Sequence, residues 1–533
     1  MAIPIGTTSR QLGALVRWMY LAVVLAGLLT WWRPDYRTWG ALIGGLMTAM
    51  LLWLCWRMVS IDRTVPGHPI YLVLLPPAGI LTYHLACTGL GGVVDNEYLI
   101  SGALNASLLF HLAMLALGVM LSQSLLPKAI THAGVVRVCG AAMIGGGVFA
   151  GFRASAEPVR EAMSLVGYGG VAVWLAPVWR PSISSPDQGF APSRYRGVFK
   201  VCSLAAAVPA SGLLAWNCPP AAIFASIGAG VTLVTASVIF SRRSRELLAA
   251  GAILAIGGSI CAMCGVSGLQ GLSFDGPLLG SGEAAFGQMI QGQRVLQAVS
   301  AHDSGLQILC RTIGAPAAML TAAGLAGCLV MLMIRARRDH SGDKAQCVAW
   351  TVASLLCAGA LLNRGGLFVP AVVLAFGLTW GLAAEAAGRS SRPRPGITVL
   401  VVLVAIMVLM GVARSNGLLI WAANSLCPKA GGDKLLHAVF GMLLSMTLAW
   451  LMGARSLRRG LTGIGLACLV GGAGELVQYL TTTGRSVEWT DWGAHAAGSI
   501  AALGPYLLCL GARQCESPDA TGHTPQVRDP YVG

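Results

Sequence analysis

The chain is dominated by apolar segments that recur from one end to the other, each long enough to cross a membrane. A bilayer has a hydrocarbon core about 30 Å thick, which a helix of about 17–25 apolar residues can cross. Within lipid, each segment must satisfy its own backbone amides, which favours helices. The candidate spans are 14–32, 39–58, 70–90, 105–125, 134–152, 162–179, 198–214, 220–240, 246–266, 314–334, 347–363, 367–387, 397–413, 435–453, 461–481 and 492–511. The sequence therefore predicts an all-α polytopic membrane protein with about 16 transmembrane helices.

The composition agrees with this class. Of 533 residues, 55% are hydrophobic and 11% are charged, whereas an ordinary soluble domain has about 25% charged residues. The net charge of +15 does not indicate nucleic-acid binding, because the basic residues lie in small groups between apolar segments. Cys261 and Cys264 form a CxxC without a second ligand pair, so we expect no zinc site and no other cofactor.

The distribution of Lys and Arg predicts the orientation, because cytoplasmic loops keep positive charge during insertion. With the N-terminus inside, 25 of the 36 Lys and Arg residues fall on the cytoplasmic side and 11 outside, and the C-terminus is also cytoplasmic. The first apolar segment is not followed by a small-residue cleavage site, so we interpret it as a span and not as a signal peptide. The segments around Asn217 and Pro219 fit two helices or one broken helix.

The predicted topology also suggests how the chain is divided. One long loop, 266–313, lies on the outer side between the ninth and tenth spans, and we expect it to be ordered and functional. The segment 388–395, GRSSRPRP, interrupts the apolar pattern and separates a domain of residues 1–390 from one of residues 397–512. The final residues, 516–533, are expected to form a disordered cytoplasmic tail.

The outer loop carries two short motifs. The first is Pro277-Leu-Leu-Gly-Ser-Gly followed by Phe286, and the second is His302-Asp303 followed by Leu-Gln just before the next span. In this order and position, residues 1–390 resemble the O-antigen ligase family. The resemblance implies a metal-independent glycosyltransferase of the bacterial inner membrane. Such an enzyme would transfer or polymerise a glycan from undecaprenyl diphosphate onto a lipid-linked acceptor at the outer face.

The resemblance assigns His302 to the acceptor, as the catalytic residue that orients or deprotonates its hydroxyl. Arg294 and Arg311, the only Lys or Arg residues in the loop, are the candidates to hold the diphosphate. The role of Arg311 rests on its chemistry, because family members usually have an acidic residue there. The alternative is that His302 caps a helix at the interface and that both arginines are solvated.

Several positions depart from the ligase pattern. Asp303 stands where an Asn is expected, Gly305 replaces an aromatic residue, and 217–219 replaces a Ser-Arg pair. An Arg usually found upstream of the first motif is missing from 265–275. The missing basic residues are cations that a diphosphate needs, so these departures predict altered or lost ligase chemistry.

The C-terminal segment 397–512 contains polar elements in a fixed order across its spans. They resemble the VanZ-like family, a four-span module named for a glycopeptide resistance protein, although His495 replaces a usual Asn. The matching residues are Asp433, Lys434, His437, Glu475, Gln478, Gly484, Arg485, Ser486, Asp491 and Gly498.

Ionisable side chains at membrane depth are costly, so those of this segment are expected to face away from lipid. Glu475 and Gln478 share a helix face, which could point toward His437. With Lys434 and Arg485, this outer-leaflet group suits a phosphate-bearing lipid or an envelope precursor. The alternative is a polar network that packs the four helices.

Two functions follow from these observations. The first is an envelope glycosyltransferase in which the C-terminal module assists with lipid binding. The second is a non-catalytic membrane protein that binds an isoprenoid or glycolipid and affects antibiotic tolerance. A transporter is less favoured because the sequence has no evident repeat of interrupted helices.

Overall fold

The protein is helical throughout the part that the structure describes. The computed structural model describes residues 5–30, 36–59, 70–90, 108, 111–112, 114–122, 133–154, 157–176, 193–240, 251–257, 309–310, 312–338, 344–362, 369–387, 432–452, 456–481 and 489–515. None of these residues lies in a strand. The all-α prediction is therefore confirmed for the described residues.

The helices coincide with most of the predicted spans. Three predicted spans cannot be compared in full, because 105–125 and 246–266 are described only in part and 397–413 lies outside the described residues. The helices are α1 (Ile5–Thr30), α2 (Tyr36–Val59), α3 (Ile70–Leu90), α5 (Ala133–Arg153), α6 (Glu157–Leu175), α7 (Ser193–Asn217), α8 (Pro219–Phe240), α12 (Ala315–Arg338), α13 (Lys344–Leu362), α14 (Pro370–Ala386), α17 (Gly432–Leu451), α18 (Leu457–Thr481), α19 (Trp489–Ala501) and α20 (Leu503–Cys515).

Among the described residues, five helical stretches are long and apolar enough to cross a membrane by length and composition. They are Gln11–Leu28, Pro219–Phe240, Ala315–Arg338, Lys344–Leu362 and Trp489–Gly511. The last combines α19 and α20, because the amides of Ala502 and Tyr506 donate to the carbonyls of Gly498 and Ala502 and continue the helical hydrogen bonding. These stretches support membrane association, whereas the predicted number of about 16 spans exceeds what they establish.

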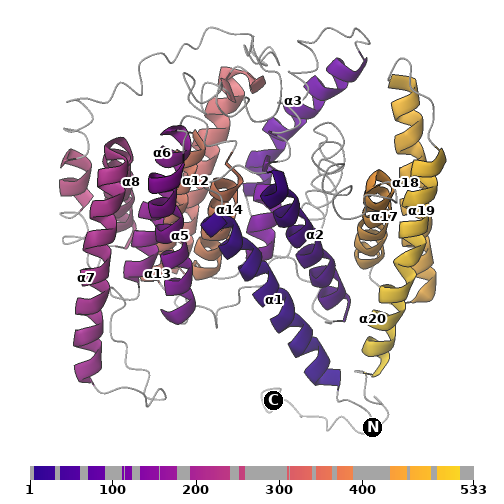
Figure 1. The fold of residues 1–533 in the computed structure, drawn as a ribbon, viewed down its shortest axis with the longest axis horizontal. Helices are drawn as coiled ribbons and strands as arrows, with labels where there is room; N and C mark the ends of the chain where they lie inside the picture. The colour runs from indigo at the N-terminus through magenta and orange to yellow at the C-terminus, as the bar shows by residue number, and fades with distance from the viewer. Residues whose placement is uncertain are drawn as a thin grey trace, which may run out of the picture.

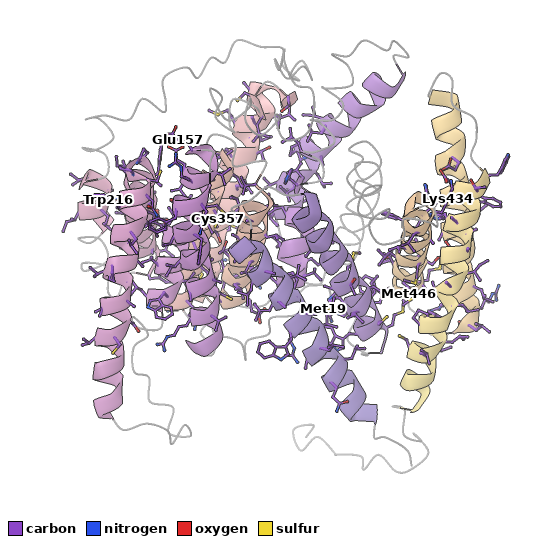
Figure 2. The ribbon with its side chains drawn as sticks, viewed as in Figure 1. Met19, Glu157, Trp216, Cys357, Lys434 and Met446 are labelled. Atoms are coloured by element: carbon purple, nitrogen blue, oxygen red, sulfur yellow. The ribbon has the colours of Figure 1, made fainter. Side chains whose placement is uncertain are left out.

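Large apolar side chains cover much of the outer surface. Trp216 is 85% exposed at the end of α7 (Figure 2), and Leu508 is 76% exposed on α20. Water-soluble monomers rarely expose apolar surface on this scale. Outward-facing apolar residues are expected where the surrounding solvent is lipid.

Helix α14 forms the centre of the N-terminal part. Every residue from Ala371 to Ala387 is buried, as expected for a helix that is apolar on all sides. Its neighbours include α1, α12 and α13 (Figure 1). Beside this centre, the Tyr20 hydroxyl lies 2.8 Å from the Ser122 hydroxyl and donates to the Gly118 carbonyl at 3.0 Å, so both hydroxyl groups are paired within the core.

Helices α5 and α6 pack against each other at backbone distance. A Cβ on Gly140 would lie 2.9 Å from the Gly170 carbonyl oxygen, and one on Gly170 would lie 2.7 Å from the Gly140 carbonyl oxygen. Small residues at such crossings are the usual means of close helix packing in membranes.

The C-terminal helices form a separate group on one side of the molecule, beside α2 (Figure 1). Helix α17 packs against both α18 and α19. The Trp53 and Trp450 rings meet edge to face with centroids 5.5 Å apart, which joins α2 to α17. The Cys509 thiol donates to the Cys55 carbonyl at 3.7 Å, which joins α20 to the same helix α2.

Candidate functional site

The polar residues of the C-terminal helices meet where three helices converge. Lys434 and His437 lie one turn apart near the beginning of α17, and Asp491 lies in the first turn of α19. Glu475 lies toward the end of α18. Because a carboxylate is favoured near the positive N-terminal end of a helix, Asp491 suits its position.

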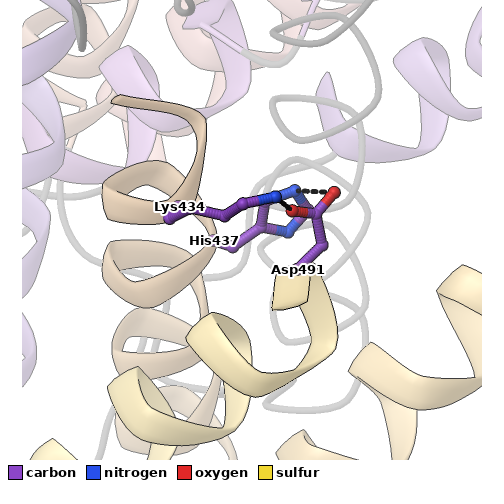
Figure 3. A network of polar contacts seen from close by, with 3 residues as sticks. All are labelled: Lys434, His437 and Asp491. Atoms are coloured by element: carbon purple, nitrogen blue, oxygen red, sulfur yellow. Dashed lines mark hydrogen bonds and ion pairs between the residues drawn. The ribbon is translucent and has the colours of Figure 1, made fainter. Parts of the chain in front are cut away.

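The two oxygen atoms of the Asp491 carboxylate contact different side chains. Its Oδ1 atom accepts a hydrogen bond and ion pair from the Lys434 ammonium, and its Oδ2 atom lies 3.5 Å from His437 Nε2 (Figure 3). The Asp491 side chain is 3% exposed, whereas those of Lys434 and His437 are 31% and 20% exposed. The site therefore has a buried carboxylate on its inner side and two nitrogen groups on its accessible side.

Glu475 completes a group of possible metal ligands. The donor atoms of His437, Glu475 and Asp491 all lie within 4.8 Å of one another. Helical spacing predicted that Glu475 could point toward His437, and the structure places it there. Within the described residues, this is the one group of three such donors that close together.

Glycines allow α17 and α19 to approach closely enough to form the site. A Cβ on Gly441 would overlap the His495 carbonyl oxygen, and one on Gly498 would overlap the Ala438 carbonyl oxygen. Both positions therefore require a residue without a side chain. This close crossing lies within two turns of Asp491 and brings its carboxylate to α17.

His495, one helical turn after Asp491 on α19, is buried. Its Nε2 atom lies 3.1 Å from the Ala467 carbonyl oxygen on α18. Gly471 leaves space for its imidazole ring, because a Cβ there would overlap the ring. His495 therefore links α19 to α18 and does not belong to the group of possible metal ligands.

Two exposed tryptophans lie at the start of α19, close to Asp491 in the sequence. The Trp489 and Trp492 rings meet edge to face with centroids 6.2 Å apart, and the Trp492 indole donates to the Cys468 carbonyl at 3.1 Å. Exposed Trp residues at a helix end are typical of the membrane–water interface.

The other predicted site residues cannot be placed. His302, Arg294, Arg311 and Arg485 lie outside the described residues. Asp433 lies in α17 and Gln478 lies in α18, but the structure does not describe their side chains. Their assigned roles stay predictions.

Comparison with known proteins identified no similar protein. No family model matches the chain, and no similar curated protein or solved structure was found. The candidate site therefore rests on its own geometry and on the motifs in the sequence.

Proposed function

We propose that the protein handles a lipid-linked envelope precursor, an undecaprenyl diphosphate-linked glycan, at the outer face of the bacterial inner membrane. In this proposal the chain crosses the membrane about 16 times with both termini in the cytoplasm. Residues 1–390 form a ligase-like domain and 397–512 a VanZ-like module. The apolar outer surface and the asymmetry of Lys and Arg support this arrangement.

One observation carries the proposal: the group of Lys434, His437, Glu475 and Asp491 at one end of the C-terminal helices. Burying Asp491 and Glu475 beside apolar helices is costly, so a function is the expected reason for retaining them. Lys434 and His437 are the partly exposed members, and both can donate hydrogen bonds to phosphate oxygens. The neighbouring Trp489 and Trp492 suit the level of a lipid headgroup.

The proposal predicts that Lys434→Met weakens binding of undecaprenyl diphosphate. Purified full-length protein in phosphatidylcholine nanodiscs would be titrated with this lipid and the complexes counted by native mass spectrometry. We expect about a tenfold loss of affinity, because a charge-assisted hydrogen bond of about 1.5–3 kcal/mol is removed.

Lys344→Met is the matched control, because Lys344 lies at the start of α13 and its ammonium sits 5.9 Å from the centre of the Phe240 ring. This variant should bind the lipid like the unchanged protein. Equal affinity for the Lys434 and Lys344 variants would contradict the proposed lipid site.

We further propose that the ligase-like domain transfers or polymerises the glycan onto a lipid-linked acceptor, with His302 acting on the acceptor hydroxyl. The support for this second function is the pair of loop motifs in the sequence. His302→Ala in the native host is then expected to lower surface glycan by at least about 100-fold, the loss typical for a positioned general base.

An unchanged glycan profile in the His302→Ala strain would exclude the catalytic role. It would favour the non-catalytic alternative, a VanZ-like protein that binds the lipid and alters antibiotic tolerance. Turnover of undecaprenyl diphosphate glycan by purified protein would in turn exclude that alternative.

A further inference from the structure

The group of His437, Glu475 and Asp491 has the donor types of a metal site. One imidazole nitrogen and two carboxylate oxygens come from three different helices, α17, α18 and α19. Nitrogen and oxygen donors in this mixture suit Zn²⁺ or Mn²⁺ better than they suit a soft ion such as Cu⁺. Three protein ligands also leave coordination positions for water or for an oxygen of a bound molecule.

The distance between His437 Nε2 and Asp491 Oδ2 agrees with shared coordination. At 3.5 Å it exceeds the usual hydrogen-bond range of about 2.7–3.2 Å. Two ligand atoms that each lie about 2.1 Å from a tetrahedral ion are about 3.4 Å apart. The two side chains are therefore spaced as ligands of one ion, and Glu475 lies within reach of both.

Charge favours a cation at the same place. The donor atoms of Glu475 and Asp491 lie within 4.8 Å of each other, so the two carboxylates repel when both are ionised. Both carboxylates belong to buried residues, where this repulsion is costly. A divalent ion between them replaces the repulsion with attraction.

We propose that His437, Glu475 and Asp491 bind a divalent cation, Zn²⁺ or Mn²⁺, at the junction of α17, α18 and α19. Lys434 pairs with the Oδ1 atom of Asp491, so the Oδ2 atom is the one that remains for the ion. The sequence alone indicated no metal here. The identity of the additional ligand, a phosphate oxygen of the lipid, rests on the proposed function, whereas the ion site itself does not.

Mn²⁺ is the suitable probe because the chain has 15 Cys residues, whose thiols prefer softer ions such as Zn²⁺. Full-length protein in phosphatidylcholine nanodiscs, cleared of metal by a chelator, would be titrated with Mn²⁺. Free Mn²⁺ would be measured by electron paramagnetic resonance. We expect saturable binding that Zn²⁺ displaces, and absence of such binding would overturn the proposal.

Glu475→Gln and Asp491→Asn are expected to weaken Mn²⁺ binding by at least about 100-fold, because each removes a charged ligand. The matched control is Glu157→Gln, at the exposed start of α6 and outside the group. Equal binding by all three variants would overturn the site. Each variant would first be checked for an unchanged elution volume and an unchanged circular dichroism spectrum at the temperature of the titration.

The Lys434→Met variant tests how the ammonium beside Asp491 affects the affinity of the site for Mn²⁺. Without the ammonium beside Asp491, we expect Mn²⁺ to bind roughly tenfold more tightly, because one cation no longer opposes the other. Weaker Mn²⁺ binding in this variant would contradict the proposed arrangement.

The proposed ion site and the proposed lipid function can be contradicted independently of each other. Loss of Mn²⁺ in Asp491→Asn with unchanged affinity for undecaprenyl diphosphate would support the ion site and contradict its link to the lipid. Lipid binding that depends on Lys434 in a protein that binds no Mn²⁺ would overturn the ion site and leave the proposed function standing.

Discussion

At the scale of single residues, the ion pair between Lys434 and Asp491 joins the helices α17 and α19. The Lys434 side chain is partly exposed, whereas the Asp491 side chain is almost fully buried. If one side chain of the pair is removed, water can therefore solvate a remaining Lys434 more easily than a remaining Asp491. Removing the lysine leaves the more deeply buried charge, which is the more costly change.

A double-mutant cycle tests this pair. Lys434→Met should lower the free energy of unfolding by about 2–3 kcal/mol and Asp491→Asn by less, because a remaining Lys434 is hydrated more easily. The double variant should lose less than the sum of the two, with a coupling of about 1–3 kcal/mol. Unfolding in mild detergent followed by circular dichroism gives these values, and strictly additive losses would show that the pair does not stabilise the helices.

The sequence predicted the members of this site better than their arrangement. The sequence identified four candidates, Lys434, His437, Glu475 and Asp491, for two reasons. Ionisable residues in apolar segments are costly, and these four follow the order of the polar motif described for residues 397–512. Spacing along a helix does not determine how closely two helices cross. The contacts of the Asp491 carboxylate with both Lys434 and His437 are therefore seen only in the structure.

At the scale of helices, the crossing of α17 and α19 depends on glycine. Gly498→Ala should lower the free energy of unfolding by about 1–3 kcal/mol, because the added methyl group overlaps the Ala438 carbonyl oxygen. Thermal unfolding of the full chain in detergent measures the change.

Gly493→Ala on the same helix is the control for this substitution. A Cβ at Gly493 meets no atom within 4 Å, so alanine there should be neutral or stabilise by up to about 1 kcal/mol through helix propensity. Equal destabilisation by both alanines would show that the close crossing is not what Gly498 provides.

Apolar length predicted where the helices lie but not where they end. Helix α7 begins at Ser193, earlier than the predicted 198, because residues 193–197, which include Arg194 and Arg196, continue the helix ahead of the apolar segment. The predicted span 492–511 divides into α19 and α20. Pro505 has no amide hydrogen to donate to the Ala501 carbonyl, so one helical hydrogen bond is missing at the junction, whereas the amides of Ala502 and Tyr506 still donate across it.

At the scale of the whole molecule, the predicted boundary at 388–395 lies outside the described residues, so the division into two domains stays a prediction. The contacts across it are nevertheless specific. Trp450 on α17 and Cys509 on α20 both reach α2, one through Trp53 and the other through the Cys55 carbonyl. Packing of this kind depends on contacts far apart in the sequence, which apolar patterning alone does not predict.

The contact of α17 and α20 with α2 has a consequence for movement in the bilayer. Two membrane proteins in a shared pathway ordinarily diffuse separately and meet by chance. Here the C-terminal helices are held against the second helix of the chain, so the two regions move through the lipid together and in equal number. A chain cut between them would expose Trp53 and Trp450 to lipid, and reassembly would then depend on how often the two pieces collide.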